Sequence, residues 1–575
     1  MTKRITGAEA IFRGLLAEGV DTVFGYPGGA ILPVYDKLYD YTDCLRHILA
    51  RHEQGAIHAA QGYARVSGKT GVVIVTSGPA ASNVVTGLAD AYADSTPLVV
   101  ITGQVAVNFL GSDAFQEIDV VGITQPITKW THQVRRAEDL NEALARAFYI
   151  ASTGRPGPVV LDIAKDAQLG LTDDNYTPCR YIRSYNPNPV VSGDDLERAA
   201  ALINSSRCPM ILSGHGVMIS QAEDELRRLA EKAEIPVACT LLGLSTIPSD
   251  HRLYMGMLGM HGNVAPNVNT NRADLIVAVG MRFDDRVTGD ASRYAPDARI
   301  IHIDIDSSEF DKNVTADVHI HGDAREVLAG LLPLVDKASH KVWLNSFERH
   351  AEVERQKVSC AATAPGDPDG PMKMGEVASK VSAATGDRAV LVTDVGQNQM
   401  FSSRYFRFTE SRSIITSGGL GTMGFGLPAA IGAKLAAPER TVCLFTGDGG
   451  LQMTVQELGT IMEYHADVKI ILLNNRFLGN VRQWQELFFK SRFSQTPLLN
   501  PRFDLIAEAY GVGYRRVAVS GELDAGIAAM LSHDGAFLLD VNIDETDKVF
   551  PMTPVGGAVD TIMLNPTEKY QPDNG

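Results

Sequence analysis

Two turns in the last third of the chain carry side chains that could hold a divalent cation beside an anion. Gly447-Asp448-Gly449-Gly450 follows the apolar segment RTVCLFT, and Asn474-Asn475 ends the next apolar segment, VKIILL. If both segments are parallel strands, their carboxyl ends meet at the edge where such sheets bind ligands. Carboxylate and amide oxygens suit Mg²⁺, and glycines at a helix start let backbone amides approach a diphosphate. Either turn alone would more often be an ordinary connection in a doubly wound sheet, but their pairing favours a metal and diphosphate site.

The segments that must position these turns are apolar runs separated by helical patterns. In the first part, DTVFGYPG, CLRHIL, GVVIVTSG and PLVVITG are typical of buried strands, and helices are expected over 53–67 and 80–93. The alternation continues through two more units, separated by polar, Pro-containing stretches. We therefore expect an α/β protein with three doubly wound parallel-sheet domains at residues 1–170, 190–345 and 370–546, and a tail at 547–575.

The first and third units share a local design. TSGPAASN (76–83) and TGDGGLQM (446–453) each end an apolar strand and open a helix. One pair of similar turns is modest support, but it suggests that the two units have a duplicated architecture.

Composition limits the classes of function. The 575 residues allow three or four domains at about 150 residues each. A net charge of −16 disfavours nucleic acid and anionic lipid as partners. No apolar run is long enough for a membrane span, and the charged N-terminus does not resemble a signal peptide. Six scattered cysteines without metal-site spacing suit a reducing, cytoplasmic compartment.

Longer motifs now identify a family. The G-D-G…N-N arrangement resembles the cofactor motif of thiamin diphosphate-dependent decarboxylases and carboligases. Over almost the whole chain, the motifs resemble those of the large, catalytic subunits of acetohydroxyacid synthase (acetolactate synthase). The segments that carry this resemblance are FGYPGGA (24–30), RHEQGAIHAAQGYAR (51–65), TGRPGPVV (153–160), GMLGMHG (256–262), RFDDR (282–286), SGGLGTMGFGLPAA (417–430) and LGNVRQWQ (478–485).

The resemblance implies a transferase that decarboxylates pyruvate on thiamin diphosphate and condenses the hydroxyethyl enamine with a second 2-keto acid. With pyruvate as acceptor the product is 2-acetolactate, and with 2-ketobutyrate it is 2-aceto-2-hydroxybutyrate, in the first common step of valine, leucine and isoleucine biosynthesis. The resemblance also implies Mg²⁺, a structural FAD, a homodimer or homotetramer with active sites at its interface, and a small regulatory subunit. The three domains would bind the cofactor pyrimidine, FAD and the cofactor diphosphate, in that order.

For thiamin diphosphate, the resemblance implies that Glu53 hydrogen-bonds N1′ of the aminopyrimidine and promotes its imino tautomer. The Gly421 carbonyl would accept the 4′-amino hydrogen, and Met423 would support the bend between the rings. A lone Glu53 would be read as a surface residue, and Met423 as core filling. The remaining matched positions are Pro27, Gly28, Gln397, Gly447, Gly449 and Gly450 for the cofactor, and Asp448, Asn475 and Phe477 for the metal.

For the substrates, Arg286 resembles the arginine that holds the carboxylate of the second keto acid, and Trp484 the tryptophan that favours 2-ketobutyrate. A surface ion pair and a packing indole are the alternatives. Phe115, Gln116 and Lys165 match further active-site positions. The family commonly has His where this chain has Asn398, Met where it has Asn480, and Pro where it has Ala164.

For FAD, the resemblance points to the middle unit. The matched positions are Arg155, His261, Arg282, Asp304 and Asp323. The family usually has three glycines where this chain reads Ser213-Gly214-His215-Gly216.

Other readings of the same cofactor motif are weaker. Glyoxylate carboligase is disfavoured by Glu53, pyruvate oxidase by the tryptophan of RQWQ, and an FAD-independent catabolic acetolactate synthase by RFDDR. A catalytically silent assembly subunit is disfavoured by the intact Glu53, Asp448 and Asn475.

Overall fold

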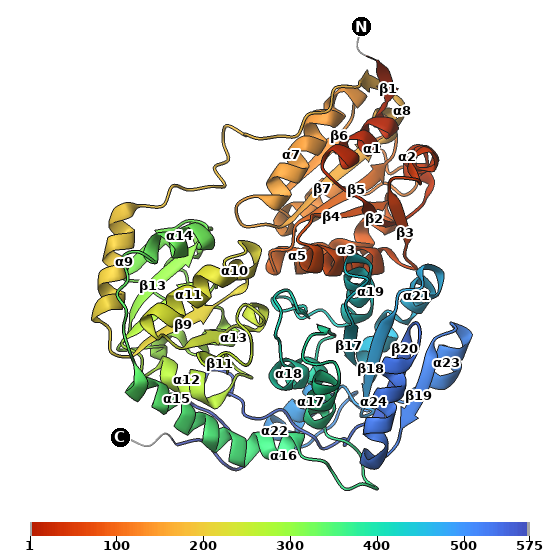
Figure 1. Cartoon of the computed structure of the whole chain (residues 1–575). Helices are drawn as coiled ribbons and strands as arrows, with labels where there is room; N and C mark the ends of the chain where they lie inside the picture. Colours follow the sequence, from red (N-terminus) through yellow and green to blue (C-terminus); the bar gives the residue numbers. More distant parts are fainter. Residues whose placement is uncertain (1–2, 572–575) are drawn as a thin grey trace.

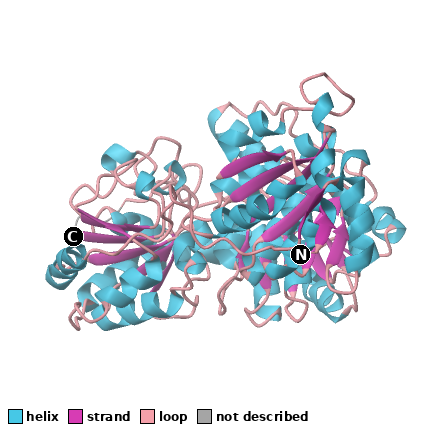
Figure 2. Ribbon diagram, turned by 90° about the horizontal axis from the view of Figure 1, so that it is seen from above, coloured by secondary structure: helices cyan, strands magenta, loops and turns pink. Residues whose placement is uncertain are grey.

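Three six-stranded parallel sheets form the frame of the protein, in a computed structural model that describes residues 3–571. Figure 1 shows the first unit above, the middle unit at the left and the third unit below at the right. Helices lie on both faces of the strands (Figure 2), as expected for doubly wound sheets. The predicted fold class is therefore confirmed.

The first sheet has the order β3-β2-β4-β5-β7-β6, and its central strands are completely buried. Beside it, β1 (Arg4–Thr6) pairs antiparallel with β8 (Leu171–Asp173). The six strands are β2 (Thr22–Tyr26), β3 (Arg46–Leu49), β4 (Gly71–Val75), β5 (Leu98–Gln104), β6 (Trp130–Val134) and β7 (Pro158–Ala164). The α-helices are α1 (Gly7–Ala17), α2 (Leu32–Leu38), α3 (Glu53–Ser67), α4 (Pro79–Asn83), α5 (Val85–Ala93), α6 (Val120–Thr124), α7 (Leu140–Ser152) and α8 (Lys165–Leu169).

The middle sheet has the order β11-β10-β9-β12-β13-β14, which is the strand order of dinucleotide-binding folds. Its strands are β9 (Pro209–Ser213), β10 (Val237–Cys239), β11 (Tyr254–Met257), β12 (Leu275–Val279), β13 (Arg299–Asp304) and β14 (Val318–His321). The helices are α9 (Gly193–Ser205), α10 (His215–Ile219), α11 (Glu223–Ala233), α12 (Val264–Thr270), α13 (Asp285–Thr288), α14 (Ala324–Leu331), α15 (Lys341–Glu354) and α16 (Cys360–Thr363).

The third sheet has the order β16-β15-β17-β18-β20-β19. Its strands are β15 (Val390–Thr393), β16 (Ile414–Ile415), β17 (Val442–Gly447), β18 (Val468–Asn474), β19 (Gly513–Val517) and β20 (Phe537–Asn542). The helices are α17 (Met374–Ala384), α18 (Gln397–Tyr405), α19 (Gly426–Ala436), α20 (Asp448–Met453), α21 (Leu458–Tyr464), α22 (Gly479–Phe488), α23 (Phe503–Ala509) and α24 (Leu523–Ser532). Numbered within each unit, the first and third sheets share one strand order, so the suggested duplication extends to their whole topology.

Small residues bring the first and third units into direct contact. Helices α3 and α19 pack against each other (Figure 1), with Gly62 against the backbone of Ala429 and Gly432 against that of Ala59. A Cβ at either glycine would collide with the opposing backbone. The small residues on the facing sides of α3 and α19 therefore allow the two helices to pack closely.

The C-terminal segment after β20 contains no helix or strand as far as residue 571, where the description ends. It crosses to the middle unit, where Phe550, Met552 and Ile562 join one apolar cluster with Val264 and Val268 of α12.

Candidate active site

In each sheet there is one point where the chain stops adding strands on one side of its first strand and continues on the other side. These points lie between β2 and β4, between β9 and β12, and between β15 and β17. Open parallel sheets bind ligands outside the carboxyl ends of the strands at such points. Half of the predicted cofactor residues lie at or just after the ends of these strands, at ligand-binding edges, namely Pro27, Gly28, Arg282, Gln397, Gly447, Gly449 and Gly450.

The predicted metal residues meet at the edge of the third sheet. Asp448 begins α20 and is buried, and burial raises the pKa of its carboxyl to about 6. Asn500 Nδ2 donates to Asp448 Oδ2 at 2.6 Å and to Asn474 Oδ1 at 2.9 Å. Asn475 Oδ1 accepts from the Phe477 backbone N–H at 3.1 Å. The two turns singled out in the sequence therefore form one polar cluster, with Asn500 as an additional member.

The diphosphate residues adjoin this cluster. Gln397 Oε1 accepts from Asn475 Nδ2 at 3.3 Å, which links the loop after β15 to the turn after β18. A Cβ at Gly450 would collide with Asp394, and one at Gly447 would lie 3.3 Å from Asn398 Nδ2. Glycine is thus required at 450, and a side chain at 447 would crowd Asn398.

These residues fit Mg²⁺ and a diphosphate. One carboxylate and one amide oxygen stand at the same sheet edge, and Mg²⁺ usually takes one or two carboxylates plus phosphate oxygens. The buried Asn398 Oδ1 has no hydrogen-bond partner among the described residues. Within residues 3–571, no group of three or more His, Cys, Asp or Glu side chains could hold a metal. The Asp448 cluster therefore suits a cation that takes its remaining ligands from the oxygens of a bound phosphate.

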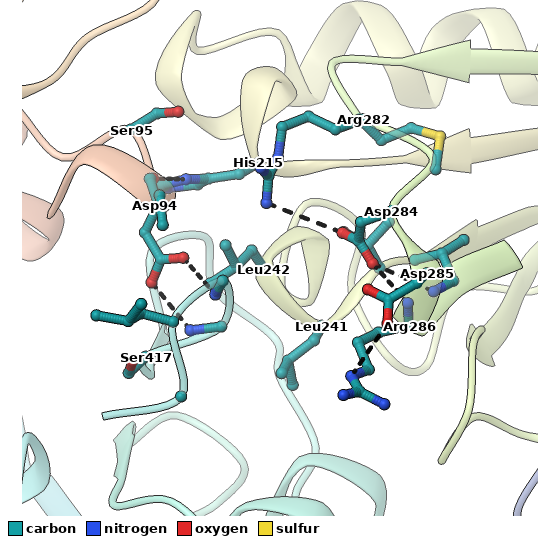
Figure 3. A pocket seen from close by; sticks show the side chains of 18 of the residues that line it. Asp94, Ser95, His215, Leu241, Leu242, Arg282, Asp284, Asp285, Arg286 and Ser417 are labelled. Atoms are coloured by element: carbon teal, nitrogen blue, oxygen red, sulfur yellow. Dashed lines mark hydrogen bonds and ion pairs between the residues drawn. The ribbon is translucent and has the colours of Figure 1, made fainter. Parts of the chain in front are cut away.

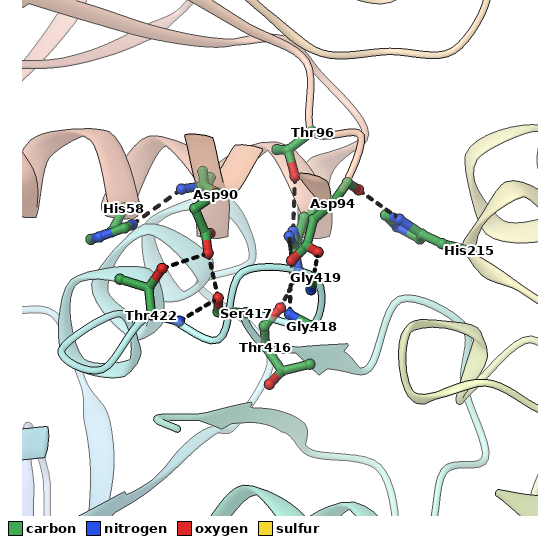
Figure 4. A network of polar contacts seen from close by, with 12 residues as sticks. His58, Asp90, Asp94, Thr96, His215, Thr416, Ser417, Gly418, Gly419 and Thr422 are labelled. Carbon is green, nitrogen blue, oxygen red and sulfur yellow. Dashed lines mark hydrogen bonds and ion pairs between the residues drawn. The ribbon is translucent and has the colours of Figure 1, made fainter. Parts of the chain in front are cut away.

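The loop that carries Gly421 and Met423 is held by carboxylates from two units, and Figure 4 shows those of the first unit. From the first unit, Asp94 accepts from the backbone N–H groups of Gly418, at 2.9 Å, and Gly419, at 2.6 Å. From the third, Asp394 accepts from Gly424 and Gly426. Gly421 has φ of +71°, a conformation that glycine adopts without strain.

Asp90, in α5 of the first unit, makes a second attachment to the same loop. Its Oδ1 accepts from the hydroxyls of Ser417 and Thr422, the latter at 2.9 Å. Burial raises the pKa of Asp90 to about 6. The loop is thus fixed on both sides of the exposed tip at 419–421.

A cavity of about 1270 Å³ opens between the three units (Figure 3). All five predicted FAD positions line it, together with Arg286, Trp484 and Gly421. The predicted residues on its wall come from the first unit (Arg155), the middle unit (His261, Arg282, Arg286, Asp304, Asp323) and the third (Gly421, Trp484). The structure therefore unites the predicted flavin residues with two of the predicted substrate residues.

The cavity has the features of a dinucleotide site. A Cβ at Gly214 or Gly216 would strike the backbone of Gly280, so these glycines bring the loops after β9 and β12 together at the switch point. Asp304, at the end of β13, is buried, and burial raises its pKa to about 7. Carboxyl groups at strand ends can bind ribose hydroxyls. This combination of a glycine cradle and a strand-end carboxyl fits FAD.

Charged groups are distributed unevenly around the cavity. Arg155 is paired at 2.7 Å with Glu309, whereas the nearest carboxylates to Arg282 and Arg286 are 3.9 and 3.8 Å away. His261 is buried, and burial lowers its pKa to about 4, so the ring is neutral. The two loosely paired arginines leave positive charge available to an anionic ligand.

A second group of predicted residues lies apart from this cavity. They are Pro27, Gly28, Glu53, Phe115, Gln116 and Lys165, and none is among its lining residues. All follow strands of the first sheet, at its carboxyl edge. Glu53 begins α3, and its Oε2 accepts from Asn83 Nδ2 at 2.9 Å. Within one chain, Glu53 is thus not brought to the cavity that Gly421 lines.

Sequence reasoning missed Asn83, Asn500 and the two aspartates that hold the Gly421 loop. Asn83 stands in the noted segment TSGPAASN, so its motif was visible although its role was not. Asn500 lies in the turn LLNPRF, where no sequence pattern marks it. Asp90 and Asp94 are four residues apart on a helical pattern, a spacing equally typical of an exposed helix face.

Known proteins resemble the chain throughout its length. Models of the thiamine pyrophosphate enzyme family match it at residues 5–123 (N-terminal TPP binding domain), 196–331 (central domain) and 394–541 (C-terminal TPP binding domain).

Three curated relatives with similar sequences are named acetolactate synthase large subunits. A probable acetolactate synthase large subunit of Methanocaldococcus jannaschii is 46% identical and covers 97% of this chain and 95% of its own length. The acetolactate synthase large subunit of Haemophilus influenzae is 42% identical, with coverages of 98% and 99%. Isozyme 2 of Escherichia coli is 44% identical, with coverages of 96% and 98%. With three domain models matched and identity above 40% over nearly the full length, the chain belongs to the acetolactate synthase large-subunit family of thiamine pyrophosphate enzymes.

Proposed function

We propose that this protein is an acetolactate synthase, which decarboxylates pyruvate and joins the remaining two-carbon fragment to a second 2-keto acid. The observation that carries the proposal is the common placement of Arg286, Trp484 and Gly421 on one cavity. The guanidinium of Arg286 can bind the carboxylate of pyruvate or 2-ketobutyrate, and the indole ring of Trp484 can contact the alkyl group of that acceptor. The acid product would enter branched-chain amino-acid synthesis.

Thiamin diphosphate, when bound, supplies the carbon nucleophile and the electron sink for decarboxylation. Asp448 and Asn475 would hold Mg²⁺, with the Phe477 segment beside it, and Gln397 with Gly447, Gly449 and Gly450 would receive the diphosphate. Met423 and the Gly421 carbonyl would orient the aminopyrimidine. The fixed loop keeps these two groups in place before the cofactor arrives, so little ordering remains to be done on binding.

Glu53 would exchange a proton with N1′ of the aminopyrimidine. A carboxyl group can donate to or accept from a ring nitrogen, and Asn83 orients it through the 2.9 Å hydrogen bond. Pro27 and Gly28 end β2 at the same sheet edge and would contact the pyrimidine.

Arg286 would bind the carboxylate of the acceptor, because a guanidinium matches a planar carboxylate. Trp484 would contact the additional methyl group of 2-ketobutyrate. Phe115, Gln116 and Lys165 would close the site from the first unit.

FAD, when bound, would fill the middle cavity and brace the three units without a redox step. Arg155 and Arg282 would meet its anionic groups, Asp304 and Asp323 its hydroxyls, and His261 would pack beside it.

We further propose that two copies build each active site, as a homodimer or homotetramer. Support comes from Glu53 lying outside the cavity and from exposed apolar side chains on the same part of the first unit. Phe115 is 88% exposed and Phe109 51%. A second copy that covered them would bring Glu53 to the Gly421 loop.

The proposal also covers the domain limits, a partner subunit and the cellular compartment. Domain limits of 1–170, 190–345 and 370–546 fit the three sheets, and a small regulatory partner is suggested because the relatives are named large subunits. The six free thiols fit a reducing cytoplasm. No helix in the described part of the chain is long and apolar enough to cross a membrane.

The test is a direct assay. Purified protein given pyruvate, thiamin diphosphate, Mg²⁺ and FAD is expected to release CO₂ and form acetolactate. Formation of CO₂ without acetolactate would point to a simple decarboxylase. No product with or without FAD would overturn the proposed activity.

A further inference from the structure

His215 places an imidazole on the wall of the large cavity, between the first and middle units (Figure 3). It follows β9 and begins α10, and the glycines on either side leave its side chain as the sole one projecting from residues 214–216. The ring is partly exposed, and its exposure is to the cavity that it lines.

A hydrogen bond settles which ring nitrogen carries the proton. His215 Nδ1 lies 3.1 Å from the backbone carbonyl oxygen of Asp94 (Figure 4). A carbonyl oxygen only accepts, so Nδ1 must be the donor and must carry the hydrogen. Nε2 of a neutral ring is then an acceptor. Among residues 3–571 it has no hydrogen-bond partner, and its lone pair is left for a ligand.

The surroundings keep this ring neutral. Burial is the main cause that lowers the pKa of His215 to about 4, and the nearby guanidinium groups of Arg65 and Arg412 act in the same direction. The Asp94 carboxylate opposes them, but it is already bound to Arg65 at 2.6 Å. At neutral pH the ring therefore has no proton on Nε2 with which to bind a phosphate or carboxylate oxygen.

Elsewhere on the cavity wall, arginines supply hydrogen-bond donors, whereas His215 Nε2 is an acceptor. Arg282, whose nearest carboxylate is 3.9 Å away, presents guanidinium donors that suit the anionic part of a ligand. His215 Nε2 requires a ligand O–H or N–H instead. In a flavin dinucleotide, such donors are the ribityl and ribose hydroxyls and the imide N–H of the flavin ring.

We propose that His215 Nε2 accepts a hydrogen bond from a hydroxyl or imide N–H of FAD and so helps select an uncharged part of the flavin at this wall. The inference rests on the proposed flavin site and adds a residue to it. The same ring is joined through Asp94 to the backbone of Gly418 and Gly419, so its replacement must be chosen to preserve that bond.

Two substitutions separate the functions of the two ring nitrogens. In His215→Asn, the side-chain amide can still donate to the Asp94 carbonyl but has no atom at the position of Nε2. In His215→Gln, the longer amide can place its oxygen near Nε2. His319→Asn is the control, because His319 is a half-buried histidine of β14 that bonds to Asp311 and does not line the cavity.

The experiment measures binding of FAD to flavin-free protein by fluorescence and equilibrium dialysis, without any substrate. Loss of one hydrogen bond is expected to weaken FAD binding by His215→Asn about three- to tenfold. His215→Gln should retain more affinity than His215→Asn, and His319→Asn should match the unsubstituted protein. Thermal unfolding of the flavin-free variants checks that the fold is intact.

Flavin analogues then identify the donor. If N3-methyl-FAD, which lacks the imide N–H, binds the unsubstituted protein as weakly as His215→Asn binds FAD, the imide is the partner. If N3-methyl-FAD binds as FAD does, a hydroxyl is the partner.

Equal FAD affinity of His215→Asn and the unsubstituted protein would overturn the role of His215 while leaving the flavin site intact. Failure of the unsubstituted protein to bind FAD at all would instead overturn the flavin site itself, and this inference with it.

Discussion

Replacing Trp484 should change which of two products the enzyme forms. It lines the cavity beside Asn480, and its ring meets Phe488 edge-on at 6.1 Å. We predict that Trp484→Leu lowers the preference for 2-ketobutyrate over pyruvate about tenfold, because one methylene contact is worth about 1–3 kcal/mol. The measurement is the product ratio with both keto acids present. An unchanged ratio would assign Trp484 to packing alone.

Asn500 should support metal binding from a distance. Its amide group bridges Asp448 Oδ2 and Asn474 Oδ1, and it thereby fixes the orientation of the carboxylate. Loss of such a supporting group typically costs about 10–100-fold in metal affinity. We predict an increase of this size in the Mg²⁺ concentration that Asn500→Ala needs for thiamin diphosphate binding. If the Mg²⁺ requirement stays the same, Asn500 only stabilises the turn.

Individual residues also mark the limit of sequence reasoning about the site. Asp448 and Asn475 could be predicted because each ends an apolar strand in a recognisable turn. Asn500 could not, because its role depends on a loop that reaches the cluster through tertiary contacts. Phe115, Gln116 and Lys165 remain predictions, since nothing in one chain places a ligand beside them.

Among the structural elements, the loop 417–424 depends on buried carboxylates from the first unit. Asp94 is almost inaccessible, and it pairs with Arg65 at 2.6 Å while it accepts two backbone N–H groups of the loop. Asp94→Asn would leave the Arg65 charge buried without its partner, which costs about 3–5 kcal/mol. We predict that loss in the free energy of unfolding, together with weaker thiamin diphosphate binding.

A surface pair provides the control for Asp94→Asn. Asp139 pairs with Arg136 at 2.8 Å, but both side chains are exposed. Asp139→Asn should therefore change stability by less than about 1 kcal/mol and leave cofactor binding as it was. Similar losses for both variants in denaturant titrations would contradict the role of Asp94 in holding the loop 417–424.

Asp90, the second attachment of the loop, should give stability a pH dependence. Burial raises its folded-state pKa to about 6, above the value near 3.9 expected for an unfolded chain. Between these values the folded state binds more protons than the unfolded state, so this group contributes less stability as the pH rises toward 6.

Comparing the unsubstituted protein with Asp90→Asn isolates the contribution of the Asp90 carboxyl to the pH dependence of stability. We predict that lowering the pH from 7.5 to 5 stabilises the unsubstituted protein relative to Asp90→Asn, as measured by denaturant unfolding at each pH. A constant difference between the two proteins would show that the folded and unfolded pKa values of Asp90 are the same.

The strands show why much of the fold could be predicted. Central strands such as β4, β5 and β7 are buried at every position, so each produces an uninterrupted apolar run. Sequence reasoning missed the short strands β1 and β8 and four strands at edges of the six-stranded sheets, β6, β11, β16 and β19. WTHQV in β6 and GYRRV in β19 are mostly half-buried and polar, so they lack that signal. Helix α3 was predicted with its observed limits, whereas the expected helix at 80–93 is interrupted at Val84 between α4 and α5.

At the scale of the whole molecule, the single chain divides the proposed chemistry between two places. Asp448, Gln397 and the Gly421 loop lie on the third unit, while Glu53 and Asn83 lie at the edge of the first unit. Either group alone lacks a necessary part of the reaction. Glu53→Gln is therefore expected to abolish most turnover, and Asp448→Asn to abolish metal-dependent cofactor binding, while both variants keep the fold.

Mixing these two inactive variants tests whether the parts come from different chains. If each site takes Glu53 from one copy and Asp448 from another, a mixed dimer contains one site with both substitutions and one with neither. At equal amounts and free exchange, half of the dimers are mixed, so activity should return to about a quarter of the unsubstituted level. If each site is built within one chain, every site of a mixed dimer still carries a substitution, and no activity returns. Activity after mixing, followed together with oligomer size by sedimentation, therefore distinguishes a shared site from an internal one.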